Sequence, residues 1–307
     1  LPVDRMLIRD SRLALVDRGG DARLGFESVA LRWRRMADDE WRFALDARHD
    51  AERINGRMRL DTGDDRAARA VIDLAGLSGA RIAPWVPNPA LQPQAAGRLD
   101  GRLWVNVAET GGVRITADLA GTALGLLNGG VASLDSRAQA VGHAGQWRGQ
   151  IRARRMTLAD GREVTPGPIG FGREAGAPWR IALRDMPLDP LAPLLSRRLE
   201  RPLAIAGRTG PATLIWRDAS DWRLSAAIDA QHVRIPEHDW EANDARVHVD
   251  AGPRGGRAVF EGGAVRPGGA ATTTVLRDVP RLARLAGTVR WWHAAAGQWR
   301  VELLEGR

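Results

Sequence analysis

The chain has 307 residues, 44% of them hydrophobic, and a formal net charge of +8 at pH 7. It contains no Cys and no Lys, which excludes disulfides, thiolate metal sites, a Walker P-loop and Schiff-base catalysis. With 35 Gly, 17 Pro and no Tyr, its composition favours turn-rich β structure over a helical bundle.

The first 96 residues predict a strand meander followed by an interruption. Apolar and polar residues alternate with period two through residues 3–62, between turns rich in Gly and Asp at 17–21 and 37–40. Residues 67–74 predict a short helical stretch. The prolines between 84 and 93 then exclude a regular sheet interior.

The rest of the chain repeats this order. Strands are predicted over 99–107, 113–119, 147–158 and 179–184, a short helix over 188–200, a meander over 211–265, a short amphipathic piece over 280–285 and a hairpin over 286–304. The Gly/Ala-rich stretch at 120–145 has the weakest pattern. Because no linker is evident, we expect one continuous segment with sub-units at about 1–96, 97–200 and 201–307.

One amphipathic hairpin recurs along the chain. Seven of the 12 Trp residues are followed directly by Arg, and the pairs Trp33/Trp41, Trp216/Trp222 and Trp292/Trp299 bracket short polar turns. Because side chains alternate across a strand, this pattern places Trp, Phe, Leu and Val on one face and Arg on the other. The sequence therefore predicts an extended antiparallel sheet with one apolar side.

The sequence lacks recognisable catalytic motifs. There is no GxSxG elbow, and the glycines of residues 167–172 stand in the wrong order for a dinucleotide fingerprint, so a loop is expected there. A possible metal set lacks tight ligand spacing: His232, Glu237, His238, Asp239 and His248. We predict no enzymatic activity, no cofactor and no metal.

Arginine clusters at 32–35, 152–155 and 197–198 raise the question of nucleic-acid binding. The 37 acidic residues are interleaved with the arginines, which dilutes any continuous positive field. Neighbouring Trp and Arg side chains also lie on opposite faces of a strand. Nucleic acid is therefore not an expected partner, and an Arg-rich nucleic-acid binder ranks third among the functions considered.

An ordered series of motifs resembles the AsmA-like family. Residues 97–105 (GRLDGRLWV) are similar to a "G-x-l-x-G-x-l" strand that recurs in these proteins, and residues 178–191 resemble their "gw-x-l-x-l … ld-x-l" passage. Residues 285–301 resemble the "l-x-G-x-v-x-w … gw-x-v" passage of the YhdP branch, whose central region is known as a domain of unknown function. The likeness covers most of the chain and is weakest at 120–145.

The resemblance implies a role in lipid transport. YhdP, TamB and AsmA relatives are anchored in the inner membrane of Gram-negative bacteria and are regarded as bridge-like lipid transfer proteins built from repeating β-groove units. By this resemblance, the chain would be a periplasmic segment that carries phospholipids between inner and outer membrane. The implied partners are phospholipid acyl chains, the membranes (through segments outside this chain) and other envelope proteins.

The fold expected is mainly β: a long curved antiparallel sheet that forms an open hydrophobic groove, with a few short crossing helices. The residues expected to line the groove are alternating apolar positions around the tryptophans: Leu31, Trp33, Trp41, Phe43, Leu45, Leu103, Val105, Trp179, Ile181, Leu183, Leu214, Trp216, Trp222, Leu224, Val289, Trp291, Trp299 and Val301.

A closed β-sandwich fits the same alternation. In that alternative the apolar residues pack against a second sheet, and the protein serves as an interaction or scaffold module of the cell envelope. The two alternatives differ in exposed surface, since a groove presents an apolar strip well above the few hundred Å² usual for soluble monomers.

Overall fold

The described strands form one long open antiparallel sheet that is not closed into a barrel, and the described part of the chain contains two short helices. This confirms the predicted mainly-β fold class. The computed structural model describes residues 4–16, 23–37, 40–62, 67–86, 91–200, 202–218, 220–235, 240–262, 264–267, 286–293 and 299–306. The chain divides into two compact units, Leu1–Val164 and Thr165–Arg307.

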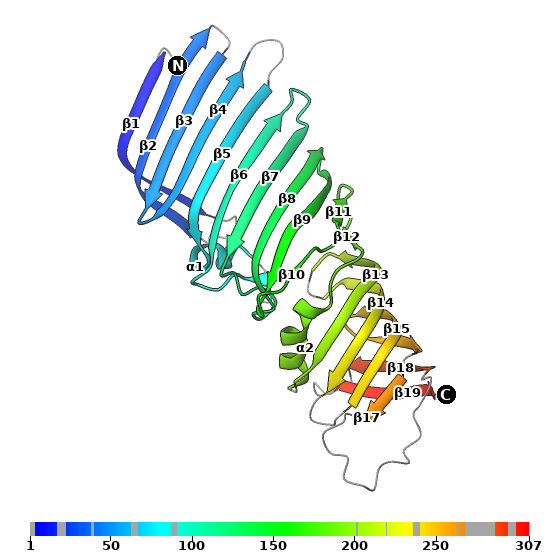
Figure 1. The fold of residues 1–307 in the computed structure, drawn as a ribbon. Helices are drawn as coiled ribbons and strands as arrows, with labels where there is room; N and C mark the ends of the chain where they lie inside the picture. The colour runs from blue at the N-terminus through cyan, green and yellow to red at the C-terminus, as the bar shows by residue number, and fades with distance from the viewer. Residues whose placement is uncertain are drawn as a thin grey trace. The chain divides into compact units, whose positions relative to one another are not determined.

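Unit 1 is a meander in which each strand from β1 to β9 pairs antiparallel with the next, and β10 pairs with β9 (Figure 1). Antiparallel pairing of consecutive strands needs no crossover, and the longest connection, residues 79–97 between β5 and β6, contains a short helix. The strands are β1 (Arg5–Val16), β2 (Arg23–Ala37), β3 (Glu40–His49), β4 (Glu52–Asp61), β5 (Ala67–Ser78), β6 (Arg98–Val107), β7 (Val113–Thr122), β8 (Val131–His143), β9 (Gln146–Leu158) and β10 (Glu163–Val164).

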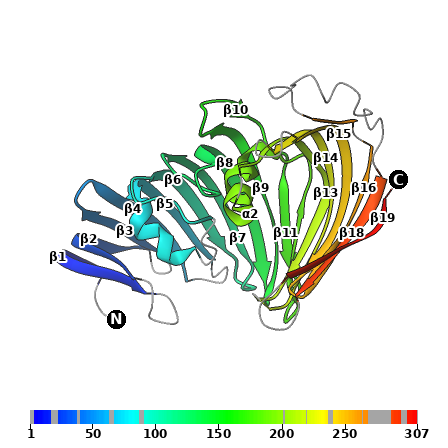
Figure 2. The same cartoon turned by 90° about the horizontal axis from the view of Figure 1, so that it is seen from below.

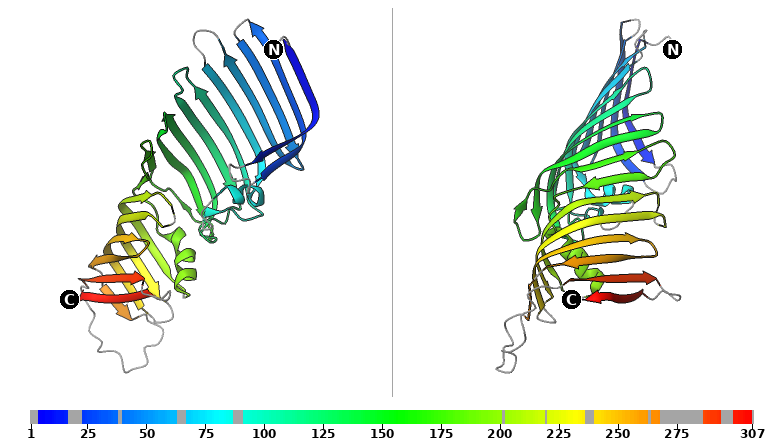
Figure 3. Two further views of the ribbon diagram at one scale, coloured as in Figure 1. Left: turned by 180° about the vertical axis from the view of Figure 1, so that it is seen from behind. Right: turned by 90° about the vertical axis from the view of Figure 1, so that its right-hand side faces the viewer.

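Unit 2 continues the antiparallel pattern from β11 to β16 (Figure 3). Strand β15 also pairs with β17, β16 pairs with β18, and β18 pairs with β19. The strands are β11 (Ile169–Arg173), β12 (Trp179–Leu183), β13 (Ala204–Trp216), β14 (Trp222–Ile235), β15 (Trp240–Gly252), β16 (Gly255–Glu261), β17 (Ala264–Pro267), β18 (Ala286–His293) and β19 (Trp299–Gly306).

The helices are short connections between strands. In unit 1, α1 (Gly79–Ile82) and the 3-10 turn η1 (Ala83–Trp85), coloured cyan in Figure 2, follow β5. Helix α1 contacts β2 and β5. In unit 2, η3 (Asp189–Leu191) and α2 (Ala192–Leu199) follow β12, which confirms the helix predicted over 188–200. The amphipathic piece predicted over 280–285 lies outside the described residues.

Two local predictions were wrong. Residues 67–74, expected to be helical, form most of β5, because β4 and β6 flank this segment and supply its backbone hydrogen bonds. Ile169–Arg173, expected within a loop, forms β11 and pairs with β12. In both cases pairing with distant strands overrides a weak local preference.

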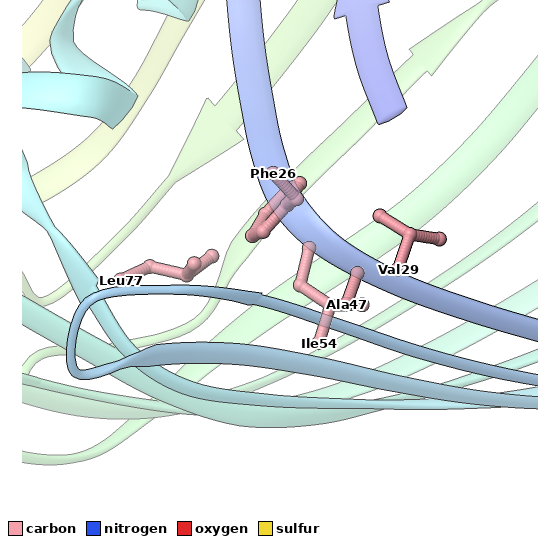
Figure 4. Close-up of a cluster of buried hydrophobic side chains, with 5 residues drawn as sticks. All are labelled: Phe26, Val29, Ala47, Ile54 and Leu77. Carbon is pink, nitrogen blue, oxygen red and sulfur yellow. The ribbon is translucent and has the colours of Figure 1, made fainter. Parts of the chain in front are cut away.

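The buried core of unit 1 lies along one margin of its apolar side. Phe26, Val29, Ala47, Ile54 and Leu77 form one cluster, in which side chains from β2 to β5 point toward one another (Figure 4). The β1–β2 ladder shifts register on both sides of Ser11, and Asp10 has a φ of 52°. Such a bulge bends the paired strands.

A second cluster belongs to the same margin. Val131, Met156 and Leu158 are buried against Leu126, Leu127, Leu134 and Val164. Leu134 lies opposite Met156 and also opposite Gly121, which in turn lies opposite Leu99 beside the first cluster. Burial in unit 1 is therefore concentrated at one end of its strands.

A buried ion pair holds α1 against this margin. Arg81 pairs with the carboxylate of Glu52, donates a hydrogen bond to the Gly25 carbonyl and lies over the Phe26 ring, 4.8 Å from its centroid. Glu52 also accepts a hydrogen bond of 3.1 Å from the Ser78 N–H. Because Glu52 is only 7% exposed, these partners are what compensates the burial of its charge.

We predict that Phe26→Ala lowers the free energy of unfolding by about 3–5 kcal/mol, since it leaves a cavity in a closed cluster. Phe43→Ala is the matched comparison, because Phe43 is only half-buried on the same side of the sheet. The loss of unfolding free energy in Phe43→Ala should be clearly smaller than in Phe26→Ala. Urea unfolding of both variants measures this, and equal costs would show that Phe43 also lies in a closed core.

Candidate functional site

The apolar side of unit 1 is continuous across the sheet. Residues that lie directly opposite each other on neighbouring strands share a face, so the strand register defines rows that cross the unit. The rows are Trp41–Leu60–Ala68–Val107–Val113–Gly142–Trp147; Met6–Trp33–Phe43–Met58–Ala70–Val105–Ile115–Ala140–Gly149; Ile8–Leu31–Leu45–Gly56–Ile72–Leu103–Ala117–Ala138–Ile151; and Val29–Ala47–Ile54–Leu74–Gly101–Leu119–Ser136–Ala153. We call these rows the apolar face of unit 1. Three polar residues belong to it: Ser136 in the fourth row, Ser11 opposite Val29 on β1, and Arg35 opposite Trp41 on β2. The Arg35 guanidinium lies over the Trp41 ring, 5.9 Å from its centroid.

The structure brings the predicted residues of unit 1 together on this face. Leu31, Trp33, Trp41, Phe43, Leu45, Leu103 and Val105 all lie in its rows, and all are half-buried. Sequence reasoning missed the contribution of β5, including Ala70 and Ile72, because that segment was assigned to a helix. In this segment Ala70 and Ile72 alternate with Arg69 and Asp73, and this period-two pattern could have identified a strand.

Unit 2 carries an equivalent face. Its rows are Trp179–Trp216–Trp222; Phe171–Ile181–Leu214–Leu224–Ala251–Gly256–Trp291–Val301; and Ile169–Leu183–Ala212–Ala226–Val249–Ala258–Val289–Leu303. These rows include every groove residue predicted in unit 2 except Trp299. Trp299 opens β19, and its side chain lies outside the described part of the chain.

Two tryptophans lie on the opposite, polar side of their strands. Trp104 is opposite Val71 and Thr116, and Trp292 is opposite Gly255 and Arg300. Arginines lie over both rings, with Arg102 6.0 Å and Arg290 5.8 Å from the ring centroids. The predicted groove residue next to Trp292 is Trp291, which lies in the apolar rows.

The apolar faces remain accessible to solvent. On unit 2, Trp216, Val301 and Leu303 are 36%, 70% and 63% exposed. The closed-sandwich alternative requires a second facing sheet, but the described strands form one open sheet.

Several ion pairs form between side chains on the polar face of unit 1. Asp46 accepts hydrogen bonds from Arg48 at 3.1 Å and from Arg53 at 2.6 Å, and Arg102 pairs with Asp73. The hydrogen bonds from the two guanidinium groups, first Arg48 and then Arg53, lower the pKa of the Asp46 carboxyl.

A row of arginines crosses the same polar face. Arg34, Arg42, Arg59 and Arg69 lie directly opposite one another on β2 to β5. Like charges in such positions destabilise a sheet. Glu40 offsets part of this cost, since its carboxylate lies 2.8 Å from Arg42 and 3.2 Å from Arg59.

Within the described residues, no group of three or more His, Cys, Asp or Glu side chains is arranged to hold a metal ion. Of the possible metal set, His232 contacts Asn243 through its Nδ1 at 2.9 Å, and His248 lies 3.3 Å from Asp250. Glu237, His238 and Asp239 fall in a stretch that the structure does not describe. None of the described helices is long and apolar enough to cross a membrane.

Comparisons with protein-family models, with curated proteins and with solved structures find no match for this chain. The resemblance to the AsmA-like family therefore stays a prediction drawn from the motifs of the sequence.

We predict a specific acid sensitivity at Asp46. The pKa of the Asp46 carboxyl is lower in the folded chain than in the unfolded chain. The stabilisation that this carboxylate gives to the folded state is therefore complete above about pH 4, and it is lost as the pH falls through the lowered pKa. Asp46→Asn should therefore reduce the loss of unfolding free energy between about pH 4 and pH 2. Urea unfolding at a series of pH values tests this prediction. It would be contradicted if the free energy of unfolding changed with pH equally in Asp46→Asn and in the unsubstituted chain.

Proposed function

We propose that the apolar faces bind phospholipid acyl chains and form the path along which these lipids move between inner and outer membrane. The chain would act as a periplasmic segment of a protein held in the inner membrane by a part outside this sequence. One observation carries the proposal. The residues of β1 to β9 keep an almost uninterrupted apolar face, while Arg, Asp and Asn predominate on the other side.

The dimensions of the rows suit an extended hydrocarbon chain. They cross β1 to β9 perpendicular to the strands, which is a path of about 38 Å at about 4.8 Å per strand. A lipid tail in water costs about 0.8 kcal/mol for each exposed CH₂ group. Contact with the rows removes much of that cost and requires no chemical step.

The division between the closed and open parts of the face also supports the proposal. In unit 1, burial is concentrated around Phe26, Ile54 and Leu77 at one margin, whereas Trp41, Phe43 and Val105 stay half-buried. The closed margin stabilises the sheet, and the half-buried rows leave apolar area for a ligand.

A protein-binding module of the cell envelope is the second candidate function. It is favoured by β19, which among the described strands pairs only with β18 and exposes Val301, Leu303 and Leu304. An exposed apolar strand with one free edge suits the addition of a strand from another protein.

The lipid proposal is tested with neighbouring positions that face opposite ways. Val105→Asp and Leu224→Asp place a charge on the apolar faces, and Asn106→Asp and Ser225→Asp place the same charge on the polar faces. Phospholipid bound to the purified protein is measured by native mass spectrometry. We expect the apolar-face variants to retain at least about tenfold less lipid, equivalent to about 1.4 kcal/mol, and the controls to match the unsubstituted chain.

Circular dichroism of the same samples shows whether the sheet persists. Loss of the sheet in Val105→Asp and Leu224→Asp would mean that these positions belong to a closed core. A folded, lipid-free unsubstituted chain would refute acyl-chain binding and favour the protein-binding module.

A further inference from the structure

The polar face of unit 1 contains a hollow of about 950 Å³ over β1 to β6. One row of residues explains its shape. Arg32, Ala44, Arg57, Val71 and Trp104 lie opposite one another on β2 to β6. Ala44 ends at its Cβ atom, so a gap opens between the long side chains of Arg32 and Arg57.

Positive charge dominates the lining of this hollow. Arg9, Arg32, Arg48, Arg53, Arg57 and Arg102 face three carboxylates: Asp10, Asp46 and Asp73. Asp46 is already paired with Arg48 and Arg53, and Asp73 with Arg102. Asp10 belongs to the bulge of β1.

Three arginines of the hollow are free to bind another anion. Within the described part of the chain, no carboxylate lies within ion-pair distance of Arg9, Arg32 or Arg57. Arg32 and Arg57 are exposed and stand on strands two apart, hence about 10 Å from each other at the backbone. A guanidinium group binds a phosphate through two parallel N–H···O hydrogen bonds, so this spacing suits two phosphate groups on one ligand.

The rows beside the hollow differ on its two sides. The next row on one side holds Asp46 and Asp73, both of which are already paired with arginines. The row on the other side holds Arg34, Arg42, Arg59 and Arg69, which raise the local positive potential. An anion in the hollow would therefore find its charged partners in Arg32 and Arg57, next to this basic row.

We propose that this hollow is a binding site for a ligand that carries two phosphate groups, with Arg32 and Arg57 as its principal contacts. The ligand is either a lipid headgroup with two phosphates or a soluble bisphosphate, since both present the same chemistry to the guanidinium groups. The site lies on the face opposite the apolar rows, so it is independent of acyl-chain binding.

The test uses the full chain and two probes. Isothermal titration calorimetry measures binding of fructose 1,6-bisphosphate, and co-sedimentation measures binding to phosphatidylcholine vesicles that contain diphosphatidylglycerol. The double variant Arg32→Gln/Arg57→Gln should weaken binding of the preferred probe by about tenfold or more, because two charged hydrogen-bonding contacts are lost.

The matched control is Arg114→Gln/Arg148→Gln, which removes the same charge from the same face outside the hollow. We expect it to leave binding nearly unchanged. Equal losses in both double variants would show general attraction to a basic surface and would overturn the site, as would failure of both probes to bind.

The two probes separate the sources of the ligand. Binding of the soluble probe supports a bisphosphate site open to solvent, and binding to vesicles alone supports a lipid headgroup. Lipid retained by Arg32→Gln/Arg57→Gln, measured by native mass spectrometry, distinguishes this site from the apolar face. Loss of acyl lipid in this variant would contradict their independence.

Discussion

The structure depends on keeping period-two alternation in register across many strands. In an antiparallel ladder, a slip of one residue would move every side chain of a strand to the other face. Between β2 and β9 the register shifts only toward the ends of strands, as between Leu74 and Leu77. Along the rest of these strands it holds, so Trp33, Phe43 and Val105 share one face while Arg34, Arg42 and Asn106 share the other. Because the sheet is one layer, this sorting leaves an apolar face without a second sheet to cover it.

At one margin of unit 1, the apolar side of this single layer is covered by other parts of the same unit. The bulge at Asp10, the Arg81–Glu52 ion pair and the buried Phe26 cluster all lie at the same end of the strands of unit 1. There the apolar side is closed and the sheet gains ordinary core burial. Away from that margin the same rows stay half-buried, which is the arrangement that a surface for hydrocarbon chains requires.

Where the alternation of apolar and polar residues is strong, the sequence predicted the sheet and the face on which its tryptophans lie. Trp41, Phe43 and Leu45 could be assigned to one face because three alternating apolar residues leave one solution for a strand. The assignment failed at β5, where Ala67, Ala68 and Ala70 carry little β preference and only pairing with β4 and β6 makes the segment extended.

The hollow on the polar face was beyond sequence reasoning. Arg32, Ala44 and Arg57 are 12 and 13 residues apart in the sequence, and they become neighbours only through the registers of β2, β3 and β4. No local pattern encodes such a row. The bend at Asp10 is equally hidden, since it arises from register shifts on both sides of Ser11 that no sequence pattern marks.

Site-specific photo-crosslinking tests the central claim most directly. A photo-reactive amino acid is placed at Phe43 or at Ala44, which are adjacent on β3 and face opposite sides of the sheet. After irradiation with phospholipid vesicles, adducts are identified by mass spectrometry. The account predicts acyl-chain adducts at position 43 and few at position 44. Equal labelling at both positions, or none at position 43, would contradict it.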